Sequence, residues 1–422
     1  MLDARIETIL LRGRDHRSRP GSVGSSTSTR RRNPGGLVSH MGSPRVAVIV
    51  RYGLNATAWR ARHERGEVAD ATPYGYHFAE PGLSLEWSVD RPEGRISHSW
   101  RMFVRRVLGF DFVHVWRNRA IIARSDVVWT HTEREHLAVG ALKVLFPRRY
   151  TARTVAQSVW LWDMWAQMSA PRRALFTRLL RAHDVEVVLS RINRDASSTA
   201  VPGRRIVRVP FGTHFASPPD PSDARPSEST PARVLVIGND RHRDWPLMAR
   251  VARRLPEVDF DIISLSEEAR GAHWPTNVAV RSIPQREILE RAYTEATIVA
   301  LPLRPNLHAS GCTVAIEAVS AGLPVVATDT GGIDEYLEGS GAALVPVGDE
   351  DAFVAALASA VRAGARTDHS VASRRGLSGA DYVARLALIT HALLANAQIA
   401  PDVERFEPPA SRAGSTVGQV TR

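Results

Sequence analysis

One stretch, residues 301–337, constrains the fold more than any other part of the sequence. It reads LPLRPNLHASGCTVAIEAVSAGLPVVATDTGGIDEYL: a strand end, a loop of small residues, a helix, a Gly-Leu-Pro break, a β-branched strand and a Gly-Gly turn. The apolar run at 325–328 is typical of a parallel strand that is buried on both faces. This order of elements predicts an α/β fold.

The loop and the helix start of this stretch predict a ligand site. Small side chains at 309–313 let a ligand approach the backbone closely. The helix expected from about 314 to 321 offers free N–H groups and partial positive charge at its N-terminus, which suits phosphate. Glu317 in its first turn does not suit phosphate, but its carboxylate can accept hydrogen bonds from both hydroxyls of a ribose. Residues 329–332 follow the strand at its C-terminal end, where open α/β sheets bind ligands.

The same stretch resembles the donor-binding core of GT-B glycosyltransferases, most closely glycosyltransferase family 4 (glycosyl transferases group 1). The residues in register with that family are Glu317-Ala318, Gly322, Pro324-Val325-Val326, Thr328 and Gly331-Gly332. The family has a second glutamate that contacts the donor sugar, and it would fall at Ala309 here. The resemblance therefore leaves the sugar open, and His308 or Ser310 would meet it instead. The likeness spans about 45–395 and is strong after 231.

The resemblance implies an α/β protein of the GT-B type, with two Rossmann-like doubly wound domains facing across a cleft. The first segment is rich in Arg, Ser and Gly, so it cannot bury enough apolar surface to offset the entropy of ordering; Met41 is an alternative start. The expected parts are a disordered tail (1–43), an acceptor-side N-terminal domain (44–215), a linker (216–231), a C-terminal nucleotide-sugar-binding domain (232–379), a helix that packs back on the first domain (380–400) and a disordered tail (401–422).

A basic loop opens the second domain. The strand expected at 233–237 is followed by Gly238 and by Arg241 and Arg243 before a helix, which predicts a phosphate site. The family uses an Arg and a Lys in this loop against the donor diphosphate, but their spacing is not kept, and a solvated arginine pair is the alternative. In the family, the loop at Pro284 edges the nucleotide base. The donor-binding candidates are Gly238, Arg241, Arg243, Pro284, His308, Ser310, Gly311, Thr313, Val314, Glu317, Asp329, Gly331 and Gly332.

The first domain supplies two candidate catalytic residues. His131 follows a buried strand at 126–130, so it either faces the cleft or packs at a helix start. Asp163 lies among three tryptophans in the segment VWLWDMW at 159–165. Apolar surroundings would raise its pKa toward a value useful for a base. Alternatively, Asp163 caps a helix.

Three further residues are acceptor-side candidates. Trp160 and Trp162 either form a platform for a sugar or a lipid or belong to the core. Gly53 lies in the first strand-to-helix loop, where the alternative is an ordinary turn.

Charge and composition bound the partners. The formal charge is +11 and the pI about 10.7, and Lys143 is the single lysine. The arginines recur singly or in short pairs on helical patterns, which favours a bias spread over the surface; a patch for nucleic acid or anionic lipid is the alternative.

The single cysteine, Cys312, excludes a disulfide within the chain. No apolar run is long enough to span a membrane and none reads as a secretory signal, so we expect a cytoplasmic protein, or one peripheral at the inner membrane face.

The predicted function is transfer of a sugar from a nucleotide-diphosphate sugar to a hydroxyl of a glycan, a lipid-linked or a small-molecule acceptor. Arg241, Arg243 and helix N–H groups would stabilise the leaving diphosphate electrostatically. No paired-carboxylate or DxD cluster stands where a catalytic metal would be needed, so no metal and no cofactor besides the donor is expected.

The family retains the anomeric configuration, which would leave Asp163 or His131 to orient the acceptor; an inverting enzyme would use Asp163 as base. The alternatives are a GT-B epimerase or phosphorylase and a non-catalytic basic protein that binds nucleic acid or anionic membrane. We expect no nucleic-acid partner, and the oligomeric state stays open.

Overall fold

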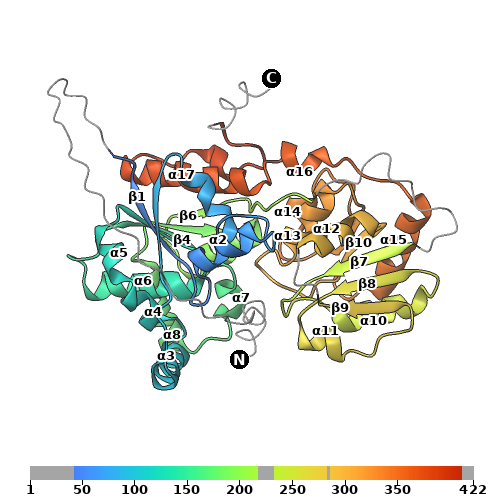
Figure 1. Cartoon of the computed structure of the whole chain (residues 1–422), viewed down its shortest axis with the longest axis horizontal. Helices are drawn as coiled ribbons and strands as arrows, with labels where there is room; N and C mark the ends of the chain where they lie inside the picture. The colour runs from blue at the N-terminus through green and yellow to red at the C-terminus, as the bar shows by residue number, and fades with distance from the viewer. Residues whose placement is uncertain (1–41, 217–231, 283–285, 411–422) are drawn as a thin grey trace, which may run out of the picture.

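The computed structural model describes residues 42–216, 232–282 and 286–410. Within these residues the chain forms two six-stranded sheets, one from each half of the sequence (Figure 1). The strand orders are β2-β1-β3-β4-β5-β6 and β12-β11-β10-β7-β8-β9, and every pairing between neighbours is parallel. In each sheet the first strand of the half, β1 or β7, lies inside the sheet, with later strands on both sides of it. The predicted pair of Rossmann-like doubly wound domains is therefore confirmed.

Helices alternate with the strands in both halves. The first half comprises β1 (Arg45–Ile49), α2 (Ala56–Glu64), η2 (Pro73–Ala79), β2 (Ser84–Trp87), α3 (Arg95–Leu108), α4 (Phe112–Arg117), α5 (Arg119–Arg124), β3 (Val127–Thr130), α6 (Glu133–Leu145), β4 (Arg153–Gln157), α7 (Leu161–Trp165), α8 (Ala170–Leu180), β5 (Val185–Val188), α9 (Arg191–Ala200) and β6 (Ile206–Arg208). The second half comprises β7 (Arg233–Ile237), α10 (Trp245–Arg254), β8 (Asp259–Ile263), α11 (Glu267–Gly271), β9 (Val278–Arg281), α12 (Arg286–Glu295), β10 (Ile298–Leu301), α13 (Cys312–Ser320), β11 (Val325–Thr328), α14 (Asp334–Leu337), β12 (Ala343–Val345), α15 (Glu350–Ala363), α16 (Ser370–Arg374), α17 (Gly379–Leu394) and η3 (Pro401–Glu404).

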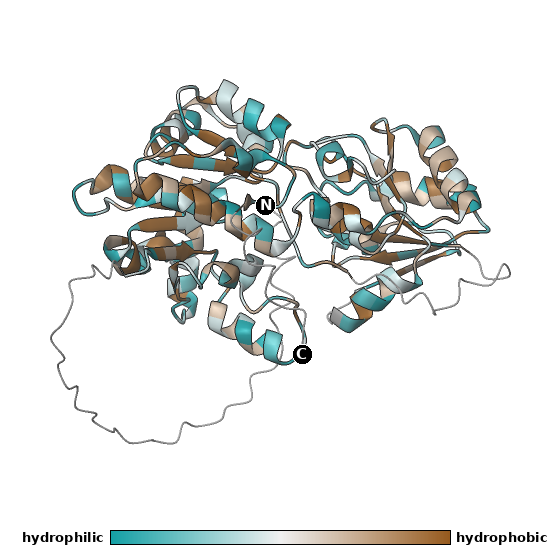
Figure 2. Ribbon diagram, turned by 90° about the horizontal axis from the view of Figure 1, so that it is seen from above, coloured by the Kyte–Doolittle hydropathy of each residue, from teal (hydrophilic) through white to brown (hydrophobic). Residues whose placement is uncertain are grey.

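The strands read as unbroken apolar runs because both faces of each sheet are covered. In β1, Val46 and Val48 pack in a cluster that includes residues of α17, whereas Ala47 and Ile49 pack in a second cluster with residues of α6 and α8. The strands of both sheets are accordingly mostly hydrophobic in Figure 2. The carboxyl ends of the strands lie at the sheet edge where open α/β folds bind their ligands.

The helix α17 leaves the second domain and returns to the first, where it lies along the sheet (Figure 1). Trp129 on β3 donates from Nε1 to Oγ1 of Thr390 at 2.8 Å, and the hydroxyl of Tyr382 donates to the side chain of Gln157 on β4. These buried polar contacts fix the helix against the sheet, so the two domains are joined by a second crossing of the chain.

The chain passes between the domains twice, after β6 and again before α17, and the two segments meet at Gly212. Thr213 donates from its N–H to Leu377 O, and Gly379 donates back to Thr213 O. A Cβ atom on Gly212 would clash with the carbonyl of Ser378.

We therefore expect Gly212→Ala to destabilise the protein by about 3 kcal/mol, since overpacking against backbone forces both segments apart. Urea unfolding of Gly212→Ala beside Gly271→Ala checks this, because nothing lies within 4 Å of a Cβ at Gly271. Equal free energies of unfolding for the two variants would contradict this, because the segments around Gly212 would then accommodate the added methyl group.

We expected residues 401–422 to form a disordered tail, and this expectation is wrong for residues 401–410. Val403 in η3 is 1% exposed, and the ring of Phe406 packs against Tyr336 with centroids 5.5 Å apart. Arg385 also donates to the carbonyl of Glu407 at 2.7 Å. Only two apolar side chains in this polar segment carry the packing, which is too weak a pattern to read from sequence. The expected tail at 1–43 and the linker at 216–231 lie almost wholly outside the described residues.

Candidate active site between the two domains

A cavity of about 420 Å³ lies between the two halves of the chain, and we call it the interdomain cleft. The first half lines it with Arg51, Tyr74, Thr132, Glu133, Arg134, Trp160 and Met164, and the second half with Ile237, Gly238, Asn239, Asp240, Arg241, Arg243, Gly311, Thr313 and Val314. Seven of the candidates from the sequence are in this lining, and they are Trp160, Gly238, Arg241, Arg243, Gly311, Thr313 and Val314. The cleft therefore gathers the basic loop and the small-residue loop that the sequence singled out.

Arg243 forms the floor of the cleft on the second domain and is only 2% exposed. Its Nε donates to Ile237 O at 3.0 Å, and its Nη1 donates to Ser310 Oγ at 2.7 Å and to Asp240 Oδ2 at 3.2 Å. A Cβ on Gly238 would clash with this guanidinium, so Gly238 is required by the arginine beneath it. Ser310 is thus a partner of Arg243 and lies behind the cleft wall. The arginine is held rigidly with one face toward the cavity.

The N-terminus of α13 opens on the same cavity. Gly311 precedes the helix with φ 86°, a left-handed conformation that favours glycine, and no side chain caps the helix there. The first N–H groups of a helix have no partners within it. Thr313 and Val314 therefore present donors and partial positive charge to the cleft, next to Arg243.

Glu317 lies one turn further along α13 and accepts a hydrogen bond from the Tyr293 hydroxyl at 2.6 Å. Burial raises the pKa of Glu317 to about 7, and the bond from Tyr293 opposes this only partly. Ala309, at the position of the family's missing glutamate, has φ 52° and is 1% exposed. Glu317 is therefore the acidic group on α13 itself, whereas Asp240 reaches the helix start from the basic loop through Ser310 at 3.0 Å.

The turn at 329–332 serves packing. A Cβ on Gly331 would clash with Asn306, and one on Gly332 would come within 2.6 Å of Ser190 in the first domain. Asp329 is exposed and donates its N–H to Val345 O at 2.8 Å. None of these three residues lines the interdomain cleft. Pro284 lies outside the described residues.

His131 lies behind the cleft wall. It is 7% exposed, is hydrogen-bonded through Nδ1 to the Tyr76 hydroxyl at 2.8 Å, and stacks on Tyr74 with centroids 3.3 Å apart. Burial lowers the pKa of His131 to about 3, so its ring is neutral. The structure thus places His131 as the support of Tyr74, which does line the cleft. This is the packing alternative of the sequence analysis.

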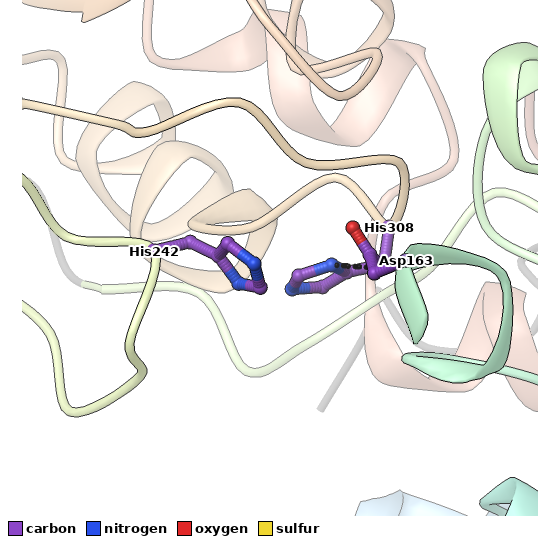
Figure 3. Close-up of side chains that lie close together, drawn as sticks. All are labelled: Asp163, His242 and His308. Atoms are coloured by element: carbon purple, nitrogen blue, oxygen red, sulfur yellow. Dashed lines mark hydrogen bonds and ion pairs between the residues drawn. The ribbon is translucent and has the colours of Figure 1, made fainter. Parts of the chain in front are cut away.

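Asp163 bridges the two domains from α7. Its Oδ2 accepts a hydrogen bond from His308 Nδ1 at 2.9 Å (Figure 3). Its Oδ1 accepts one from the N–H of Leu307 at 2.8 Å. The side chain is 6% exposed. Burial acts to raise the pKa of Asp163, but the bonds from His308 and Leu307 outweigh it and lower the pKa. The expected raised pKa is therefore wrong, and Asp163 sits inside α7, so it does not cap it.

Of the three acceptor-side candidates, one lines the cleft and two do not. Trp160 lines the cleft and meets His308 edge-on at 6.2 Å between centroids. Trp162 is 3% exposed and donates from Nε1 to Glu186 at 3.0 Å, so it belongs to the core. Gly53 donates its N–H to Asp90 Oδ2 at 3.1 Å and does not line the cleft.

Sequence reasoning missed Tyr74 and Glu133, which line the cleft, and His242, which lies outside its lining next to Arg241 and Arg243. Tyr74 has φ 59°, which is strained for a non-glycine residue and often marks a functional site. Glu133 accepts from the N–H groups of Val159 and Trp160 at 3.3 and 3.2 Å, so it holds the segment that carries Trp160. His242 lies beside His308 with centroids 4.8 Å apart. None of these has a signal in the sequence beyond its residue type.

A larger cavity of about 750 Å³ lies elsewhere, near α14 and the C-terminal segment. Its arginines are paired with carboxylates of the same cavity: Arg208 with Glu335 at 2.6 Å, Arg375 with Glu338 at 2.9 Å and Arg191 with Asp334 at 3.1 Å. Arg243 of the interdomain cleft is also paired, with Asp240 at 3.2 Å, but Arg241 beside it pairs with no carboxylate of the described residues, so we assign the anion site to the smaller interdomain cleft.

Comparison with known proteins agrees with the fold and with the second domain. A family model described as "Glycosyl transferases group 1" matches residues 231–362. A search of the curated proteins found no match. The chain is similar to the solved structure of sucrose-phosphate synthase from Thermosynechococcus elongatus, with 16% identity, a TM-score of 0.64, and coverage of 84% of this chain and 100% of that one.

Two more solved structures are similar at comparable levels. Anabaena HepE in complex with UDP-glucose is 14% identical with a TM-score of 0.56, covering 82% of this chain and 99% of that one. The apo form of the lipopolysaccharide outer core galactosyltransferase WaaB is 14% identical with a TM-score of 0.51, covering 83% and 98%. With its two doubly wound sheets the chain has the GT-B fold of these solved structures, and residues 231–362 of its second half match the glycosyl transferases group 1 family model.

Proposed function

We propose that the protein transfers a sugar from a nucleoside-diphosphate sugar, bound in the interdomain cleft, to a hydroxyl of an acceptor. The observation that carries this proposal is the convergence of the α13 N-terminus and Arg243 on one cavity. A thermal-shift panel of UDP-, GDP- and ADP-sugars tests it, because a ligand that binds only the folded state raises the melting temperature. We expect one nucleotide class to stabilise the protein, and no response to any donor would contradict the proposal.

In this proposal, groups of the protein stabilise the negative charge of the leaving diphosphate. Arg243, Arg241 and the N–H groups of Thr313 and Val314 face the same cavity. Donors fixed in advance around a water-poor site stabilise developing negative charge without reorganisation. The site therefore needs no metal at the diphosphate.

Glu317 is proposed to bind the ribose. A carboxylate is an acceptor only, so it takes both ribose hydroxyl protons better than the protonated acid does. The structure offers Tyr293 as the group that holds Glu317 in place.

Donor affinity should therefore rise with pH through about 7. The pKa of Glu317 is raised to about 7 by burial, so the free protein carries the acid form below that pH and must lose its proton to bind ribose. Titration calorimetry from pH 5.5 to 8.5 measures this, with the Glu317→Gln variant expected to bind weakly and without pH dependence.

Glu135 is the matched control, because burial also raises its pKa to about 7 and it lies on α6, away from the ribose position. Glu135→Gln should keep the wild-type pH profile. If the profile disappears in Glu135→Gln but stays in Glu317→Gln, the ribose role of Glu317 is wrong.

Asp163 is proposed as a positioning residue. Both of its oxygens accept hydrogen bonds from the second domain, and its lowered pKa makes it a poor base. It fixes His308 at the edge of the cleft beside Trp160. This suits a retaining transfer, in which the leaving phosphate oxygen takes the acceptor proton and the protein orients the acceptor.

The acceptor side carries an apolar stripe on α3. Ile96, Trp100, Phe103 and Val107 recur on one face of the helix and are 88%, 58%, 59% and 56% exposed. Exposed Arg95 and Arg106 flank the stripe, and Arg172 of α8 donates to the carbonyl of Val107. In the described residues no helix is long and apolar enough to cross a membrane. We propose that α3 lies on an anionic bilayer, so that the acceptor is lipid-linked.

Removing the two aromatic side chains should release the protein from vesicles. We expect Trp100→Ser with Phe103→Ser to lower partitioning onto phosphatidylglycerol vesicles at least about 100-fold, because each aromatic contributes roughly 1.5–3 kcal/mol when buried. Ile288→Ser, an exposed apolar residue of α12, should have no effect in the same sedimentation assay. Equal binding of all variants would remove α3 as the membrane surface.

A further inference from the structure

Three side chains that could ligate a metal ion meet at the edge of the interdomain cleft. Asp163 comes from α7 of the first domain, His242 from the loop before α10, and His308 from the loop before α13 (Figure 3). One ligand atom from each lies within 4.8 Å of the others. The two histidines are 8% and 5% exposed, and the Asp163 side chain is 6% exposed.

His242 brings a buried nitrogen without a partner. Its Nδ1 has no hydrogen-bond partner among the described residues. An unpaired buried polar atom costs about 1–3 kcal/mol, so such atoms are rare unless a ligand satisfies them. In Figure 3 the imidazole of His242 faces that of His308, whose far nitrogen is bonded to Asp163.

The charges around the cluster suit a cation. The carboxylate of Asp163 accepts hydrogen bonds from His308 Nδ1 and from the N–H of Leu307. Asp240 adds a second negative charge nearby, although its own partners are Arg243 and Ser310; Arg241 is the opposing cation.

We propose that Asp163, His242 and His308 bind one divalent transition-metal ion, best matched by Zn²⁺, which ties the first domain to the second. Two imidazole nitrogens and a carboxylate oxygen suit Zn²⁺, whereas Mg²⁺ and Ca²⁺ prefer all-oxygen sites. Zinc bonds of about 2.0–2.2 Å place neighbouring ligand atoms roughly 3.3 Å apart. The side chains therefore close in by rotation on their loops.

This ion differs from the metal that the sequence analysis ruled out. That expectation concerned a carboxylate cluster at the diphosphate, whereas this site lies at the contact of Asp163 with the two histidine loops. Three residues from three separate segments leave no spacing pattern in the sequence. The proposal stands independently of the glycosyl-transfer reaction, since it concerns binding of an ion to the free protein.

The test is a titration of the full chain, stripped with a chelator, with Zn²⁺ against a chromophoric competitor. We expect one ion per chain. His242→Ala and His308→Ala should each weaken binding more than about 100-fold, because even partners outside the ligand shell change metal affinity 10- to 100-fold. The matched control is His369→Ala, an exposed histidine, which should bind as the wild type does.

Two further readouts keep the test decisive if a variant folds poorly. Co²⁺ bound to the wild-type chain should show the intense visible bands of a low-coordinate nitrogen–oxygen site, and Zn²⁺ should raise the melting temperature of the wild type but not of His242→Ala. No stoichiometric binding by the wild type, or binding that both histidine variants retain, would overturn the proposal.

Discussion

Replacing Arg243 by leucine should reduce kcat/KM at least about 1000-fold with any donor. The guanidinium forms the floor of the interdomain cleft beside the N-terminus of α13. Removing a single preorganised donor at a site of developing negative charge costs roughly 100- to 1000-fold, and Arg243 supplies a full charge as well. Donor binding by calorimetry and product release by a coupled assay measure the effect.

The control for this variant is Arg281→Leu. Arg281 donates from Nε to Asp261 at 2.7 Å in the same domain, at the end of β9, so its loss also breaks a guanidinium–carboxylate pair. Both variants should lose stability, but only Arg243→Leu should lose donor binding. If Arg243→Leu unfolds in urea like the wild type and still transfers sugar normally, the diphosphate does not bind on Arg243.

Asp163→Asn should lower transfer about 10- to 100-fold while the donor dissociation constant changes less than twofold. The carboxylate joins the first domain to Leu307 and His308 of the second, and hydrogen bonds to a charged group contribute about 1.5–3 kcal/mol. Asparagine keeps the shape but loses the charge that orients His308. The proposed donor contacts are in the second domain, so we expect donor binding to be spared.

A matched variant is Asp334→Asn, since Asp334 also pairs across the domains, with Arg191 at 3.1 Å, but on the exposed surface. Exposed ion pairs contribute little, so Asp334→Asn should transfer at the wild-type rate. Both variants are to be assayed with and without chelator, so that an effect on a bound ion is separated from an effect on His308. A normal rate for Asp163→Asn in both buffers would remove it as a positioning residue.

The second domain was the more predictable of the two because the loops that line the cleft directly follow strands in the sequence. The helix start at 311–314 and the basic loop at 238–243 each follow a strand, and the ends of neighbouring parallel strands meet at one sheet edge. Any chain with that order brings them together. Gly238 and Gly311 were found for their small size, although the structure shows that Gly238 makes room for Arg243.

The first domain was less predictable because its side chains serve contacts between segments far apart in sequence. Asp163 was expected to orient the acceptor, or to act as the base of an inverting enzyme, but both of its oxygens accept hydrogen bonds from Leu307 and His308. His131 and Trp162 carry polar atoms at strand ends, as functional residues do, yet both are buried behind the cleft wall. Whether a polar side chain points into a cleft or into the core depends on the partner it meets, and the sequence does not tell which distant residue that partner is.

A crystal structure of the protein with UDP, the nucleotide bound in a solved structure of similar fold, tests the placement of the donor most directly. We expect the diphosphate to bind Arg243 and the N–H groups of Thr313 and Val314, and the ribose hydroxyls to donate hydrogen bonds to Glu317. The nucleotide bound instead in the larger cavity, on Arg191, Arg208 or Arg375, would contradict it.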